Sequence, residues 1–196
     1  MKEESGSELA KSTRRAKELI PELWEVPSSF RKRLGDEVGR QRAMIDDGHL
    51  LIILHKPPRP DDTAREGRLF WRSPAGEWRC FDLDGEIKSL EAHFEQYTRR
   101  LDELDAREAK AVTADEYFEL LSELTTLHRA ARNQHSAFQE ARQQIDSRDL
   151  INFRDRCYSI ERLAELLQID SKNSLDLTIA RQAEEQAETG HHMALS

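Results

Sequence analysis

Histidines are the residues whose chemistry is simplest to recognise, because imidazole binds metal ions and transfers protons near neutral pH. His49 and His55 lie six residues apart in an apolar run. That spacing is about 20 Å along a strand, so the two cannot hold one ion together. His128 and His135 lie roughly 10 Å apart on one helical face and would need His93 from a neighbouring helix. We interpret these three as the polar edge of a helix seam, so the sequence assigns no metal ligand.

Carboxylates are abundant, but none is paired in an apolar context that would raise its pKa for acid–base catalysis. Asp102, Glu103 and Asp105 have the spacing of a solvated helix face. The sequence also contains no glycine-rich phosphate loop, no G-x-S-x-G and no H-E-x-x-H. We therefore expect a protein that is not an enzyme and that requires no cofactor.

The composition favours long amphipathic helices, which combine a narrow buried stripe with a wide polar face. Of the 196 residues 35% are charged and 37% are hydrophobic, and the formal net charge is −8. Such a chain is not attracted as a whole to nucleic acid or to anionic lipid. A basic cluster within residues 31–42 is the local exception, and its Arg40 and Arg42 could contact an anion. A solvated helix end is the preferred interpretation of that cluster.

Cysteine usage and hydropathy indicate a cytoplasmic protein. Cys80 and Cys157 occupy apolar positions without a C-x-x-C spacing, which is typical of buried, reduced thiols. The longest apolar run, residues 50–54, is far shorter than the ~20 residues that span a bilayer. With no secretory signal in view, we expect cytoplasmic localisation and no membrane insertion.

Residues 86–188 carry the strongest periodicity and predict three or four long helices. Apolar residues recur there at steps of three and four, so that each helix has one apolar stripe to bury against another helix. A Thr113 capping box separates the first two helices, over about 87–111 and 113–145. Residues 148–188 form either one helix of about 40 residues or a kinked pair, which Gly190 ends. The residues expected to make interactions are Leu90, Phe94, Tyr97, Leu101, Phe153 and Leu167 of these stripes, with Arg40 and Arg42 of the basic cluster.

Residues 13–85 predict a small α/β head. His49–His55 is apolar on both faces, as in a central strand that is covered on both sides. Residues 69–81 predict a hairpin around a four-residue loop, in which Trp71 faces Trp78. Short helices are expected at 28–34 and within 13–24, where Pro21 favours an end near Ile20 with Trp24 packed on the head. Tails are expected at 1–12 and 189–196. The fold class is α+β: an N-terminal β-sheet head with a β-hairpin, then a long antiparallel, coiled-coil-like helical body.

Residues 39–55 resemble the cytosolic domain of CorA-type magnesium and metal-ion transporters. A basic stretch with Arg40 and Arg42 passes through the acidic turn Asp46-Asp47-Gly48 into an apolar strand that ends in Leu-His. The hairpin and long helices that follow are similar in layout. The chain departs from the family in having no Gly-Met-Asn signature and no membrane segment, and Gln41 stands where proline is usual. The resemblance implies an α/β head with a helical stalk that can form oligomers; it transfers no metal-sensing residue.

Two main functions stay open at this point, and binding of nucleic acid or another anion by the basic cluster of residues 31–42 is a weaker third. The preferred one is a non-enzymatic cytosolic interaction or regulatory protein that acts through its amphipathic helices, by self-association or by binding another protein. It is preferred because the heptad-like surface far exceeds any catalytic grouping. The alternative is a CorA-like domain that senses divalent cations such as Mg²⁺ through acidic helix faces.

Overall fold

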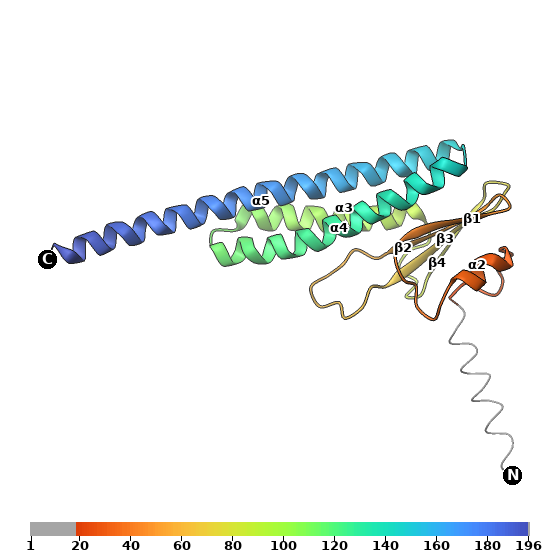
Figure 1. Ribbon diagram of the computed structural model, residues 1–196, viewed down its shortest axis with the longest axis horizontal. Coiled ribbons are helices and arrows are strands. Elements are labelled where there is room, and N and C mark those ends of the chain that lie inside the picture. The colour runs from red at the N-terminus through yellow and green to blue at the C-terminus, as the bar shows by residue number, and fades with distance from the viewer. Residues whose placement is uncertain (1–18, 196) are drawn as a thin grey trace, which may run out of the picture.

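The computed structural model describes residues 19–195 and shows a four-stranded sheet followed by three long helices (Figure 1). The elements are α2 (Ser28–Arg33), β1 (Arg42–Asp46), β2 (His49–His55), β3 (Gly67–Arg72), β4 (Trp78–Asp82), α3 (Leu90–Lys110), α4 (Ala114–Gln144) and α5 (Arg148–Ala194). The predicted α+β class, with a sheet and then a helical body, is confirmed. The expected tail at 1–12 and residues 13–18 of the first predicted helix lie outside the described residues. Residues 19–24 of that prediction are not helical.

The sheet is antiparallel with the strand order β1-β2-β3-β4, so β2 lies inside it as predicted. Alternate residues of β2 point to opposite faces, and both faces are covered. Leu50, Ile52 and Leu54 join the core that the sheet shares with the helices. Leu51 and Ile53 join a second core on the other face, which Ile20, Trp24 and Phe30 complete. The continuous apolar run of β2 therefore serves two cores at once.

The hairpin between β3 and β4 forms where the sequence predicts it, but its register differs by one residue. Gly76 N donates to Ser73 O at 2.9 Å, and Ser73 N donates to Glu77 O at 2.9 Å. Gly76 has a φ of +88°. A turn followed by a left-handed glycine makes a three-residue loop, one residue shorter than the loop we expected.

This shift of one residue places the two tryptophans on opposite faces of the sheet. Trp71 pairs with Arg79 rather than with Trp78. The Trp71 ring packs against Trp24 in the outer core, with ring centroids 5.7 Å apart. Trp78 faces the helices instead and meets Phe153 at 5.6 Å. The predicted Trp71–Trp78 pair is therefore wrong, because a one-residue slip moves every side chain of a strand to the other face.

The helical body is a bundle of three antiparallel helices that covers one face of the sheet (Figure 1). Ser89 caps α3 by accepting a hydrogen bond from Ala92 N, and the predicted Thr113–Glu116 capping box begins α4. The segment whose continuity the sequence left open is one helix of 47 residues. It passes through Gly190 and ends at Ala194, so the expected helix end at Gly190 and the tail from residue 189 are wrong. At 1.5 Å per residue α5 is about 70 Å long, against about 46 Å for α4. Its C-terminal part therefore extends beyond the other two helices.

Gly67, the first residue of β3, allows the close approach of Val38. A Cβ at Gly67 would lie 2.7 Å from Val38 Cβ and closer still to both Val38 methyl groups. We expect Gly67→Ala to lower the free energy of unfolding by about 1–3 kcal/mol, since the added methyl must displace a packed side chain. Denaturant unfolding followed by circular dichroism measures this loss.

Gly35→Ala is the matched control, because a Cβ there meets nothing within 4 Å. Combining Gly67→Ala with Val38→Ala should recover part of the lost stability, because it removes the two clashing methyl groups. A Gly67→Ala variant as stable as the Gly35→Ala variant would contradict the close approach.

Candidate functional site

The predicted apolar interaction residues lie in the protein's own core. Leu90, Phe94, Tyr97, Leu101 and Leu167 are all less than 9% exposed. Phe153 is half-buried, and its ring lies 5.9 Å from that of Phe94. In this fold their contacts hold the helices to one another and to the sheet. A role for them in binding a partner stays a prediction.

Two arginines of the basic cluster are hydrogen-bonded to the backbone of nearby loops. Arg31 donates to the carbonyl oxygens of three residues of the preceding segment, at 2.9–3.0 Å. Arg42 donates to Val38 O at 2.9 Å and to Arg40 O at 2.7 Å. Burial, with repulsion from Arg40, lowers the pKa of Arg42. Arg40 itself is exposed, and its proposed contact with an anion stays a prediction.

The structure separates the histidines that the sequence analysis considered together. His93 is fully buried, whereas His135 Nδ1 lies 2.6 Å from Glu161 Oε2 on α5. Within residues 19–195, no three His, Cys, Asp or Glu side chains are grouped so that they could hold a metal ion. A divalent cation bound by this part of the chain would therefore be held by fewer than three such side chains, or by side chains from more than one copy of the chain.

A buried arginine that the sequence analysis missed joins the sheet to the helices. Arg68 of β3 is fully buried, and its Nε lies 3.5 Å from Asp82 Oδ2 on β4. Its Nη2 donates to Gln96 Oε1 at 2.7 Å and to Glu86 Oε2 at 3.3 Å. The sequence does hold a signal for this group, because Arg68 shares strand parity with Phe70 and must face the helices. An arginine at such a position requires partners.

His93 of α3 and Gln134 of α4 extend this buried network. His93 Nδ1 accepts from Arg68 Nη1 at 3.0 Å, and His93 Nε2 donates to Gln134 Oε1 at 2.6 Å. Because arginine can only donate, the His93 tautomer is fixed with its proton on Nε2. Gln134 also lies beside the Cys157 thiol of α5, whose pKa burial raises well above its usual value while Gln134 opposes the shift. The network thus runs from β4 through β3 to all three helices.

A second set of contacts fixes the first turn of α5 to the hairpin. Asp149 Oδ2 accepts from Trp78 Nε1 at 2.7 Å and from Arg72 Nε at 3.0 Å. Partial burial opposes the charged form of Asp149, but these hydrogen bonds outweigh it and lower its pKa. The N-terminal part of α5 is therefore held firmly against the sheet.

The face of α5 turned away from the bundle carries exposed apolar side chains. We name this surface the α5 outer face and define it by Leu163, Leu166, Ile169 and Leu177, which are 52%, 42%, 46% and 52% exposed. At 100° per residue Leu166, Ile169 and Leu177 lie roughly opposite the buried Cys157, Ile160 and Ala164, and Leu163 lies on the flank between the two groups. α5 is thus apolar on two faces, and the rest of the described chain covers one of them.

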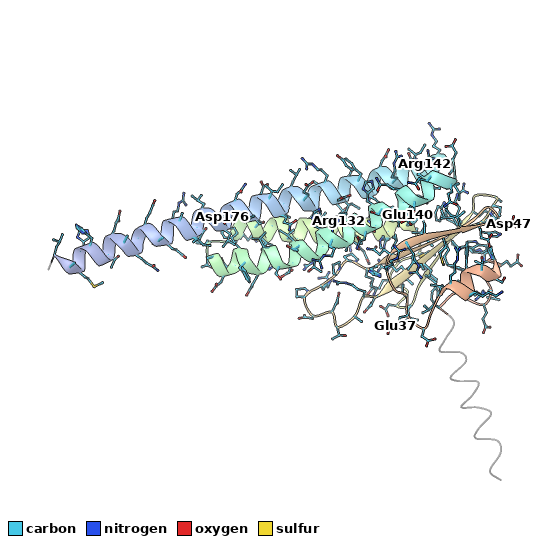
Figure 2. All side chains as sticks on the ribbon, in the orientation of Figure 1. Glu37, Asp47, Arg132, Glu140, Arg142 and Asp176 are labelled. Atoms are coloured by element: carbon cyan, nitrogen blue, oxygen red, sulfur yellow. The ribbon has the colours of Figure 1, made fainter. Side chains whose placement is uncertain are left out.

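The C-terminal part of α5 is exposed to solvent beyond the end of the bundle. Ser174 Oγ donates to Glu108 Oε1 near the end of α3, at 3.1 Å. Every residue from Ile179 to Leu195 is exposed. Figure 2 labels Asp176 close to the point where α5 leaves the bundle. A helix segment without tertiary packing is marginal in water, so this end of α5 would gain most from a partner.

Comparison with known proteins supports the fold alone. No family model and no curated protein matches the chain. The structure is similar to the ZntB cytoplasmic domain from Vibrio parahaemolyticus RIMD 2210633, with a TM-score of 0.63 and 13% identity over 82% of this chain and 80% of that one. It is also similar to the CorA magnesium transporter from Methanocaldococcus jannaschii, with a TM-score of 0.53 and 13% identity over 99% of this chain and 71% of that one.

The fold is therefore that of a CorA-type cytosolic domain, and the resemblance seen in the sequence is confirmed at that level. The first of these proteins is described as a cytoplasmic domain, and the second as a complete magnesium transporter. Of the helices described here, none is both long enough and apolar enough to cross a membrane.

The buried network makes stability depend on pH. Burial lowers the pKa of His93 from 6.5 to about 3, although the hydrogen bond to Gln134 opposes the shift. Below pH 6.5 the unfolded chain therefore binds a proton that the folded chain does not. This contribution to stability is complete above pH 6.5 and is lost as the pH falls towards 3, at up to about 1.4 kcal/mol per pH unit. We expect urea unfolding to show lower stability at pH 5 than at pH 7.

His93→Gln should flatten this dependence, because glutamine does not titrate. Burial also lowers the pKa of His55, which adds to the slope in the same direction and remains in the variant. His191→Gln, on the exposed end of α5, should keep the original slope. Equal slopes for the original protein and for His93→Gln would show that His93 is not buried as a neutral group.

Proposed function

We propose that this protein is a non-enzymatic cytoplasmic protein that self-associates through the α5 outer face. The observation that carries the proposal is the second apolar face of α5, which remains exposed after the first is buried. Four large aliphatic side chains exposed along one helix favour an interaction surface, although Asp170 and Asn173 lie between Ile169 and Leu177. A second copy of the chain is the occupant that we propose.

The reason for choosing a second copy is continuity along α5. The outer face begins beside the bundle at Leu163 and reaches Leu177, next to the exposed C-terminal segment. A second α5 laid along this face would cover the apolar side chains and the exposed end in one contact. Two long helices that meet through such faces pack by inserting the side chains of one between those of the other.

The fold also agrees with an assembly built on α5. The CorA-type resemblance implies an α/β head with a helical stalk that can form oligomers. In this chain the stalk is the bundle, and α5 is its longest member. The Asp149 contacts and the buried network fix α5 to the sheet, so the outer face is presented on a rigid scaffold. Rigid presentation lowers the entropy cost of association.

Divalent-cation sensing is the second candidate, and similarity to a magnesium transporter is the observation that favours it. Because no three suitable side chains are grouped within residues 19–195, a multi-ligand site in this form would have to be shared between copies. Carboxylates at a self-association interface would provide such ligands, since Mg²⁺ is commonly held by one or two carboxylates and several waters. The two candidates therefore predict different responses of the assembly to Mg²⁺.

We expect light scattering after gel filtration to show an oligomer. Leu166→Glu should shift this oligomer towards the monomer, with association weakened about tenfold or more, because a carboxylate would be buried in an apolar contact. The matched control is Phe118→Glu, the same kind of change at an exposed apolar residue of α4. It should leave the mass unchanged.

A monomer for the unaltered protein, or an equal loss of mass with Phe118→Glu, would contradict association through the outer face. The same measurements in millimolar Mg²⁺ separate the two candidates. A mass that changes with the ion would favour cation sensing, whereas a constant oligomer favours structural self-association.

A further inference from the structure

A cavity of about 450 Å³ opens between α3 and the loop that joins β2 to β3. In Figure 1 this loop projects away from the sheet. The volume suits a small molecule. Pro57 is the one apolar residue in the described lining, and no aromatic ring contributes to it. The cavity therefore suits a compact polar ligand rather than a nucleobase or a lipid chain.

Most carboxylates near this cavity are already paired with cations, whereas Asp62 of the lining accepts a hydrogen bond from Arg59 N. Lys56 Nζ lies 2.8 Å from Glu66 and 3.3 Å from Glu86, and it also contacts Asp84. Burial opposes the charged form of Lys56, but the three carboxylates outweigh it and raise its pKa. Lys56 therefore neutralises part of the acidic lining and offers little to a ligand itself.

Arg100 of α3 brings a buried guanidinium to the cavity. The residue is only 7% exposed, and its Nη1 and Nη2 are bound to Glu103 and Glu123. Its Nε is buried and finds no hydrogen-bond partner among the described residues. Because Nε has no accessible surface, a ligand in the cavity cannot reach it, so Arg100 shapes the wall of the cavity and offers no free donor.

Two further arginines line the same cavity with their guanidinium groups unpaired. Arg65 comes from the β2–β3 loop and Arg99 from α3. Within residues 19–195, neither side chain forms a hydrogen bond or an ion pair. The planar guanidinium fork matches the paired oxygens of a phosphate or a carboxylate. Two arginine side chains with unused donors therefore line one polar cavity.

We propose that this cavity binds a small oxyanion, a compound bearing phosphate or carboxylate groups, through Arg65 and Arg99. These residues supply guanidinium donors from the β2–β3 loop and from α3. Since the lining comes from one chain, binding does not require the self-association proposed above. Phosphate and carboxylate ligands share this chemistry, and separate probes distinguish them.

The test is isothermal titration calorimetry of the full chain with inorganic phosphate and, separately, with citrate. Sodium chloride keeps the ionic strength constant. We expect saturable binding of at least one probe. Arg65→Gln combined with Arg99→Gln should weaken it about tenfold or more, because two charge-assisted contacts are lost. Arg99→Lys keeps the charge but loses the planar fork of the guanidinium. The affinity of this variant should therefore lie between that of the original protein and that of the double variant.

Arg132→Gln is the matched control, an exposed arginine on α4 that Figure 2 labels and that does not line the cavity. It should bind like the original protein. The tighter of the two probes identifies whether phosphate or carboxylate is the natural group. No saturable binding of either probe, or equal binding by the double variant with its thermal unfolding unchanged, would overturn the proposal. Repeating the titration with Leu166→Glu should leave the affinity unchanged, so failure of self-association is distinguishable from failure of this site.

Discussion

The guanidinium of Arg68 is the group on which the arrangement of sheet and helices depends. A buried charge is strongly unfavourable unless it is paired and hydrogen-bonded. Asp82 provides the opposite charge, Gln96 and His93 accept hydrogen bonds, and His93 in turn requires Gln134. Sliding α3 or α4 by one residue would leave several of these groups unsatisfied. The network therefore specifies a register that apolar contacts alone would leave less defined.

Local pattern was sufficient to predict most of the elements. The apolar run of β2, the capping box of α4 and the stripes of the long helices depend on residues close in sequence, so the sequence alone locates them. The pairing of the hairpin could not be predicted in the same way. It depends on the left-handed conformation of Gly76, which shortens the loop by one residue and sends Trp71 and Trp78 to opposite faces.

The candidate site was harder to predict than the fold, because a periodic pattern does not say which face the chain itself will cover. Ala164 and Leu167 are buried, whereas their neighbours Leu163 and Leu166 are exposed. The sequence analysis chose Leu167 as an interaction residue and passed over Leu166. Which of these two leucines is buried depends on where α4 packs against α5, and that position is a property of the tertiary structure. The role of Arg68 has the same origin, since all its side-chain partners come from other elements.

One consequence of the length of α5 is mechanical. Asp149 fixes the helix to the hairpin at one end, α4 packs along its middle part, and the last 17 residues described, 179–195, are exposed at the other end. The exposed end of a stiff helix acts as a lever on the bundle that holds it. These residues extend about 25 Å, so a rotation of about 5° where the helix leaves the bundle displaces the tip by about 2 Å. Small side-chain rearrangements in the bundle could thus move a distant point.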